Sequence, residues 1–168
     1  MIYTLHREQI IPASIERVWD YFATPRNLNE MTPPDMAFEF VQGGTDPMYA
    51  GQVITYKVAI LPGVRVRWLT QITHVESGRC FIDEQRAGPY RLWIHEHRFE
   101  PLSEGVHMTE GVHMTDHVTY ALPFGPLGDV VHAIYIRQRL KKIFDYRREK
   151  VKTLFPNPAE TLVSRKED

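Results

Sequence analysis

Residues 125–155 read GPLGDVVHAIYIRQRLKKIFDYRREKVKTLF, and this stretch decides the fold. Its one proline stands near the start, and no strand-like alternation follows. Apolar side chains recur at helical spacing on one broad face: Ala133, Ile136, Leu140, Ile143, Phe144, Val151 and Leu154. The pattern predicts a helix of roughly 28 residues, from about Pro126 to Phe155, which is about 40 Å long. One long amphipathic helix needs one large apolar surface to cover.

The segment before this helix predicts a sheet that offers such a surface. Within 64–75, Val64, Val66 and Trp68 alternate with polar or smaller side chains, as in a half-buried strand. Short turn signals such as Gly43-Gly44 separate the predicted strands. We expect six strands here, over 36–42, 51–60, 64–75, 79–86, 90–100 and 112–122. Strands at this spacing favour an antiparallel meander.

The first part of the chain predicts one more strand and two short helices. Residues 2–12 are expected to form the strand. Ser14 is a suitable N-cap for a helix whose apolar face is formed by Ile15, Val18, Trp19 and Phe22. Thr24-Pro25 would begin a second short helix that ends at Met31. The predicted order is β-α-α-β6-α, an α+β fold in which a curved antiparallel sheet of about seven strands wraps around the long helix.

The bulk properties narrow the class of protein. A length of 168 residues suits one domain, which we place at 1–156, with a flexible polar tail at 157–168. A net charge of −1 gives no support for a nucleic-acid binder. The single cysteine, Cys80, favours a reducing compartment. Without a signal-peptide pattern or an apolar span, we expect a cytoplasmic protein with no membrane insertion, either a monomer or a homodimer.

A short tandem repeat interrupts the last predicted hairpin. Residues 104–109 read EGVHMT, and residues 110–115 repeat these six letters without change. We interpret the repeat as a small insertion in a hairpin loop, where added length costs little entropy. Because six is even, the alternation of the flanking strands is preserved. A metal-binding loop of histidine and methionine is the alternative.

Two predicted strands bring polar side chains onto one inner face. Strand alternation places His95 and His97 on the same face as Trp93 and Phe99. On the neighbouring strand, Asp116 shares a mostly apolar face that also contains Met114, Val118, Tyr120 and Leu122. We therefore expect an inward carboxylate beside two inward histidines. His6, His74 and His132 have no predicted partners, and solvated or edge positions are expected for them.

This histidine–aspartate group has several interpretations. The simplest is structural: Asp116 accepts a hydrogen bond from one imidazole, because a buried charge needs a partner. In a second, the group orients a carbonyl or hydroxyl of a ligand. In a third, a histidine polarised by Asp116 acts as a general base. His95 and His97 also point the same way, so that a metal pair with Asp116 as third ligand is a further alternative.

The order of elements and three stretches of sequence resemble the START-like helix-grip (SRPBCC) superfamily. The stretches are 11–22 (IPASIERVWDYF), 88–99 (GPYRLWIHEHRF) and 114–125 (MTDHVTYALPFG), which look like its bacterial cyclase/dehydrase-like branch. The repeat at 104–115 departs from the family pattern. The resemblance covers essentially 1–156 and implies a cavity between sheet and helix that binds a hydrophobic or amphipathic molecule, such as a lipid, polyketide or isoprenoid.

Three functions remain open from the sequence: a binding module, an enzyme of the cyclase, aromatase or dehydratase kind, and an interaction protein with a vestigial cavity. The candidate catalytic residues are His95, His97 and Asp116. We expect no metal and no cofactor. Tyr90 is a further candidate for the cavity wall. The candidate ligand-binding residues are Tyr56, Trp68, Trp93, His95, His97, Phe99, Asp116, Val118, Tyr120, Ile136 and Leu140.

Overall fold

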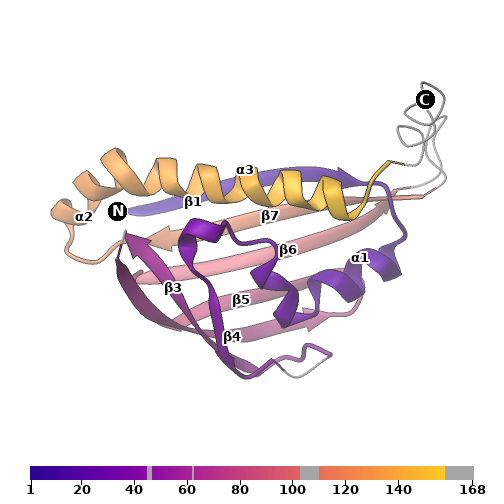
Figure 1. Cartoon of the computed structure of the whole chain (residues 1–168), viewed down its shortest axis with the longest axis horizontal. Coiled ribbons are helices and arrows are strands. Elements are labelled where there is room, and N and C mark those ends of the chain that lie inside the picture. Colours follow the sequence, from indigo (N-terminus) through magenta and orange to yellow (C-terminus); the bar gives the residue numbers. More distant parts are fainter. Residues whose placement is uncertain (45–46, 62, 103–109, 158–168) are drawn as a thin grey trace.

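A computed structural model shows one curved antiparallel sheet with a long helix lying over it (Figure 1). The structure describes residues 1–44, 47–61, 63–102 and 110–157. Seven strands are ordered β1-β7-β6-β5-β4-β3-β2 in the sheet, and every neighbouring pair is antiparallel. The predicted α+β helix-grip fold is confirmed.

The elements follow the predicted order closely. The strands are β1 (Ile2–Ile11), β2 (Glu39–Gln42), β3 (Val53–Leu61), β4 (Val64–Glu76), β5 (Cys80–Ala87), β6 (Leu92–Leu102) and β7 (Gly111–Ala121). The helices are α1 (Ile15–Phe22), the 3₁₀ helices η1 (Pro25–Asn29) and η2 (Pro34–Met36), α2 (Pro126–Val131), the π-helix η3 (His132–Ile136) and α3 (Arg137–Leu154). In the repeat, 104–109 lie outside the described residues, and Gly111 begins β7. Of the predicted tail, 158–168 also lie outside them.

The N-terminal segment contains one short α-helix and two 3₁₀ helices. Ser14 caps α1, and its side chain accepts a hydrogen bond from the Arg17 amide at 3.4 Å. The second predicted helix, expected to end at Met31, is instead the 3₁₀ helix η1, in which the Asn27 amide donates to the Thr24 carbonyl at 3.0 Å. Such tight turns are used in short pieces. The segment of α1, η1 and η2 crosses the face of the sheet that α3 leaves open (Figure 1).

The long C-terminal helix contains a π segment, and this changes which residues face inward. In η3 the Arg137 amide donates to the His132 carbonyl, five residues earlier. One extra residue in this turn shifts the helical phase upstream of it. Ala133, which we predicted to face the sheet, is therefore exposed, and His132 is buried in its place. The prediction that His132 is solvated was wrong for the same reason.

Downstream of η3 the helix covers the sheet as predicted. Leu140, Phe144 and Val151 are buried against it. Upstream, the shifted phase leaves an outward apolar stripe of Leu127, Val130, Val131 and Ile134 exposed. Among the described residues, no helix combines the length and apolarity that a membrane span needs.

Candidate functional site

A cavity of about 150 Å³ lies between the sheet, α3 and the N-terminal helices. Most of its lining is apolar. The sheet contributes Ile54, Val58 and Ile72, the helix α3 contributes Leu140, Ile143 and Phe144, and the N-terminal segment contributes Phe22, Leu28, Met31, Met36 and Phe38. The volume is small beside the roughly 300–1,000 Å³ of ordinary ligand pockets. It is of the size that holds a single aromatic ring.

Aromatic side chains form one wall of the cavity. The rings of Trp68 and Trp93 meet edge to face with centroids 5.3 Å apart, and Tyr90 lies 4.8 Å from Trp93. Nearby, the hydroxyls of Tyr56 and Thr70 are 2.8 Å apart and hydrogen-bonded. The indole Nε1 of Trp68 is buried and has no hydrogen-bond partner among the described residues. This wall can stack against a planar ligand and donate one hydrogen bond to it.

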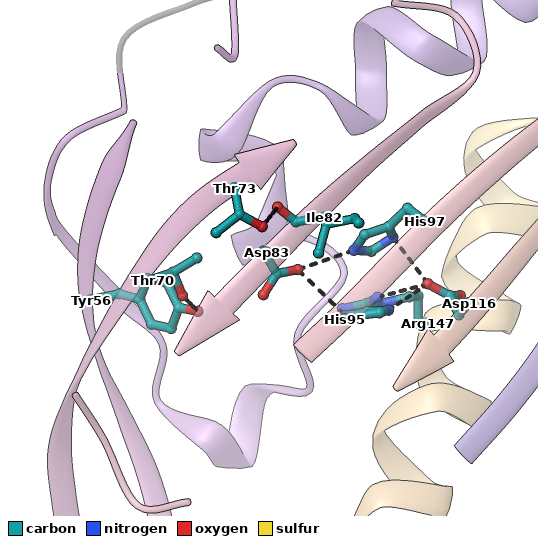
Figure 2. Close-up of polar contacts among 9 residues, drawn as sticks. All are labelled: Tyr56, Thr70, Thr73, Ile82, Asp83, His95, His97, Asp116 and Arg147. Carbon is teal, nitrogen blue, oxygen red and sulfur yellow. Dashed lines mark hydrogen bonds and ion pairs between the residues drawn. The ribbon is translucent and has the colours of Figure 1, made fainter. Parts of the chain in front are cut away.

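Five polar side chains converge at the side of the cavity where β5, β6 and β7 face α3 (Figure 2). We call Asp83, His95, His97, Asp116 and Arg147 the cavity cluster. Strand pairing brings four of them together, because Asp83 pairs with His95 across β5 and β6, and His97 pairs with Asp116 across β6 and β7. The inward alternation predicted for His95, His97 and Asp116 agrees with their burial.

The two histidines lie between the two carboxylates (Figure 2). On one side, His95 Nε2 is 2.8 Å from Asp116 Oδ1, a good hydrogen bond. His97 Nδ1 is 3.0 Å from the same oxygen but lacks the alignment of a hydrogen bond. On the other side, Asp83 Oδ2 lies 3.3 Å from His97 Nε2 and 3.6 Å from His95 Nδ1. Each imidazole therefore presents one nitrogen to each aspartate.

Arg147 reaches the cluster from α3. Its Nη1 is 3.7 Å from Asp116 Oδ1, and its guanidinium lies over the ring of Phe144, 5.0 Å from the centroid. The side chain is only 11% exposed. Nε and Nη1 are buried without a hydrogen-bond partner among the described residues. Because Arg147 also lines the cavity, these donors are suited to an acceptor oxygen that a ligand brings.

Burial and mutual charge shift the pKa values of this cluster in different directions. Burial alone would raise the pKa of Asp116, but the hydrogen bond from His95 and the close approach of both imidazoles hold it well below its usual range. Burial acts to raise the pKa of Asp83 too, but the hydrogen bond from His97 and the charges of His95, His97 and Arg147 together lower it. Burial lowers the pKa of His95, and the neighbouring His97 adds to this. Burial acts against the charged form of His97 as well, but Asp116 and Asp83 raise its pKa overall.

Six of the residues predicted to bind a ligand lie in the cavity lining: Tyr56, Trp68, Trp93, His95, His97 and Leu140. The remaining five lie outside that lining. Phe99 packs against Trp19 and Phe22 in the core, and Val118 is fully buried. Ile136 lies in η3. Asp116 stands behind the histidines and borders a separate small void between β1, β7 and α3.

Tyr120 belongs to a second polar group at the other end of the helix. Its hydroxyl is 2.8 Å from His132 Nε2, and the ring of Tyr3 stacks on His132 at 3.5 Å. The Tyr3 hydroxyl donates to Asp129 at 2.7 Å. We call Tyr3, Tyr120, Asp129 and His132 the terminal network. It holds the start of the C-terminal helix against β1 and β7.

Two members of the cavity cluster were missed from the sequence. Asp83 shares the inner face of β5 with Phe81, and the alternation of these two positions was an available signal. Arg147 follows Leu140 and Phe144 at helical spacing, so its place on the inner face was also readable. Arginines on an amphipathic helix usually face water, and for this reason Arg147 was not predicted to face inward.

Comparison with known proteins identifies the family. The model of the polyketide cyclase/dehydrase and lipid transport family matches residues 11–142. The chain belongs to this family. The match begins at the last residue of β1 and ends at Lys142, near the start of α3, so it includes four members of the cavity cluster and ends before Arg147. No curated protein matches the sequence closely enough to be reported.

Solved structures share the fold of this member of the polyketide cyclase/dehydrase and lipid transport family at low sequence identity. A Chromobacterium violaceum protein is 15% identical, with a TM-score of 0.66, covering 91% of this chain and 97% of its own. Thalictrum flavum norcoclaurine synthase with a transition-state analogue is 14% identical, with a TM-score of 0.61, covering 90% and 94%. Panax ginseng major latex-like protein 151 is 10% identical, with a TM-score of 0.64, covering 92% and 98%. At these identities the likeness shows the fold alone.

Proposed function

We propose that this protein binds a hydrophobic or amphipathic small molecule, of the lipid, polyketide or isoprenoid type, in the cavity between the sheet and the C-terminal helix. The observation that carries the proposal is an apolar cavity with one aromatic wall and one charged cluster. Ligand pockets have this composition, in which apolar surface gives affinity and a few polar groups give orientation. The description of the family, which joins cyclases with lipid transport, supports the same class of ligand.

The dimensions of the cavity favour a compact ring within it. A volume of about 150 Å³ admits about one ring, and any longer chain has to leave through the mouth. Stacking on Trp68 and Trp93 would hold the ring. An acceptor oxygen would then meet the unpaired donors of Trp68 and Arg147. Ring-bearing polyketides and isoprenoids satisfy these requirements better than an unbranched acyl chain does.

The first experiment is to purify the protein under native conditions, extract it with organic solvent and analyse the extract by mass spectrometry. We expect one lipid-like or polyketide-like species at close to one molecule per chain. Binding of panel compounds is then followed by the fluorescence of Trp68 and Trp93, which line the cavity. An empty extract, together with no binding and no thermal stabilisation by the panel, would remove the proposal and favour an interaction protein with a vestigial cavity.

A matched pair of variants tests the location. Leu140→Trp adds an indole at a buried position that lines the cavity, and we expect it to reduce affinity at least tenfold. Leu127→Trp adds the same group at an exposed position on α2, and we expect no change. Unfolding midpoints show whether both variants are folded. Equal affinities in the two folded variants would place the ligand elsewhere.

A second candidate function is catalysis of the cyclase, aromatase or dehydratase kind. The observation that favours it is the 2.8 Å hydrogen bond between His95 Nε2 and Asp116. When Nε2 carries the proton, Nδ1 keeps its lone pair inside the cluster, as a general base requires. The discriminating test is His95→Ala, with His97→Ala beside it, assayed with the identified ligand. Loss of turnover with unchanged binding would support an enzyme, whereas equal loss of both would indicate a binding role alone.

The remaining sequence-based expectations stay predictions. These are the division into a domain at 1–156 and a tail at 157–168, the cytoplasmic location, the absence of a nucleic-acid partner, and the monomeric or homodimeric state. Size-exclusion chromatography with light scattering distinguishes a monomer from a homodimer.

A further inference from the structure

We propose that Asp83, His95 and His97 bind one divalent first-row transition-metal ion at the edge of the cavity. One ligand atom from each residue lies within 4.8 Å of those of the other two. Asp83 Oδ2 faces His95 Nδ1 at 3.6 Å and His97 Nε2 at 3.3 Å. All three residues line the cavity. The proposal departs from our expectation of a metal-free protein, because the sequence pattern offered Asp116, and not Asp83, as the third ligand.

The spacing of these atoms suits ligands of a shared ion better than it suits hydrogen bonds. An N–H···O hydrogen bond is most often about 2.9–3.0 Å long. Of the two contacts of Asp83 Oδ2, the one to His97 Nε2 is a long hydrogen bond at 3.3 Å, and the one to His95 Nδ1, at 3.6 Å, is too long for a hydrogen bond. Bonds of about 2.1 Å from a tetrahedral metal to nitrogen and oxygen separate the ligand atoms by about 3.4 Å. Of the contacts to Asp116, the one from His95 Nε2 is a hydrogen bond at 2.8 Å, and the one from His97 Nδ1, at 3.0 Å, is a close ionic contact.

The protons of His95 point to the same conclusion. A neutral imidazole carries one proton, and the bond to Asp116 places it on Nε2. The lone pair on Nδ1 then faces Asp83 Oδ2 across 3.6 Å with no hydrogen between them. Two electron-rich atoms facing each other in a buried site repel unless a cation lies between them. A metal ion there removes the repulsion.

Asp116 and Arg147 complete the surroundings of such a site. Ligating histidines commonly donate their other nitrogen to a carboxylate, which fixes the ring and strengthens the ligand. Asp116 occupies this place behind His95, outside the cavity lining. The guanidinium of Arg147 lies 3.7 Å from Asp116, on the carboxylate behind the histidines. Because imidazole binds a metal in its neutral form, the charges around a bound ion would be those of the two aspartates and Arg147, which sum to −1 and favour a cation.

The donor set indicates the class of metal. Two imidazoles and one carboxylate suit Zn²⁺ or Fe²⁺, whereas Mg²⁺ and Ca²⁺ prefer sites composed of oxygen atoms. Three protein ligands leave coordination positions open, as in catalytic metal sites. The open positions adjoin the cavity, within reach of an oxygen atom of a bound molecule. The proposal itself needs no organic ligand, so its failure is separate from failure of the proposed function.

A second group of residues in the chain supplies a control. His74, Glu76 and Cys80 also bring potential ligand atoms within 4.8 Å of one another, at the turn between β4 and β5. His74 and Glu76 are exposed. Metal bound at this turn would respond to His74→Ala and Cys80→Ser. Metal bound at the cavity would not.

The experiment uses the full chain without an affinity tag, stripped with a chelator and then titrated with Co²⁺. Visible absorption reports the coordination, and elemental analysis after gel filtration gives the stoichiometry. We expect one Co²⁺ per chain with intense bands, typical of low coordination number. Asp83→Asn, which keeps the shape of the side chain, should weaken binding at least tenfold. Asp116→Asn should weaken it by about 10–100-fold. His74→Ala and Cys80→Ser should bind as the wild type does.

The proposal is overturned if the wild type retains no stoichiometric Co²⁺, if Asp83→Asn binds it equally well, or if binding is lost with His74→Ala. Should Asp83→Asn fail to fold, the wild type alone still decides. Zn²⁺ added to ¹⁵N-labelled protein should then shift the imidazole resonances of His95 and His97 at one equivalent. Shifts confined to His74 would place the ion at the β4–β5 turn.

Discussion

The cavity cluster and the terminal network both join histidine and aspartate at the C-terminal helix, but of the two only the cavity cluster leaves buried polar atoms without a partner among the described residues. In the terminal network, His132 and Tyr120 bond at 2.8 Å, and Tyr3 and Asp129 bond at 2.7 Å. Among the described residues, none of its buried side-chain atoms lacks a partner. The cavity cluster leaves His97 Nδ1 and two nitrogens of Arg147 without a hydrogen bond.

This difference separates a structural group from a functional one. Natural proteins pair nearly all their buried polar atoms, so unpaired ones call for an explanation. In the terminal network, pairing is complete within the fold, and its role is to fix the helix start. In the cavity cluster, completion requires a group from outside the chain. The proposed organic ligand supplies such a group, because an acceptor oxygen can pair with the donors of Arg147. The proposed metal ion would instead bind the atoms of Asp83, His95 and His97 that face one another.

The largest expected effect is that of Asp116→Ala on stability. Removing this carboxylate leaves His97 and Arg147 as buried charges with less compensation, at a cost of about 3–5 kcal/mol. Urea unfolding measures the loss. Asp129→Ala, the corresponding change in the terminal network, removes a partly exposed carboxylate and should cost less. A larger loss in Asp129→Ala than in Asp116→Ala would reverse the comparison.

A smaller effect is expected from Tyr120→Phe. The change deletes the hydroxyl that bonds His132 Nε2 and leaves this buried nitrogen unpaired, which should cost about 1–2 kcal/mol. Thermal and urea unfolding both report it. Tyr49→Phe is the matched control, because Tyr49 is exposed, and it should stay within about 0.5 kcal/mol of the wild type. Equal stabilities of the two variants would mean that the terminal network contributes nothing measurable.

The smallest expected effect is a shift in the titration of His132. Burial lowers its pKa below the ordinary 6.5, the charge of Arg137 adds to this, and Asp129 opposes it. The folded state therefore favours the neutral ring. Its contribution to stability is complete above pH 6.5 and declines as the pH falls from 6.5 through the lower folded-state pKa.

NMR titration of the His132 ring measures this shift directly. Arg137→Gln should move the midpoint up, and Asp129→Asn should move it further down. A wild-type midpoint at or above 6.5 would contradict the account of the terminal network.

Local sequence patterns were enough to predict the fold and part of the site, because each pattern leaves only a few possible positions for a side chain. A strand has a period of two, so Trp93 as an inward residue placed His95 and His97 on the same face. Strand alternation could not show which of the inward residues border the cavity. Phe99 and Tyr120 share faces with cavity residues, yet neither lines the cavity. Phe99 lies further along β6, and Tyr120, although it pairs with Trp93, lies on the next strand and bonds His132. Distance along a curved sheet depends on the whole structure.

The errors in the helix have a specific cause. The predicted face of Ala133 and Ile136 assumed one unbroken α-helical period. The π segment adds a residue to one turn of the helix, and the sequence of His132–Ile136 contains no local signal that predicts a π-helix. Arg147 was recoverable from its spacing to Leu140 and Phe144. Asp83 was harder, because Cys80 and Phe81 are both buried at the start of β5 and obscure the alternation.

The π segment divides the C-terminal helix into two parts whose inward faces are set separately. Each residue turns an α-helix by about 100°, so deleting one residue from His132–Ile136 would rotate everything upstream by that angle. Leu127 and Ile134 would then leave their outward positions, and His132 would leave Tyr120. Downstream, Leu140 and Arg147 would keep theirs. An insertion or deletion in this segment therefore changes which residues face inward at the helix start without changing those that line the cavity. The two parts of the helix can vary independently for this reason.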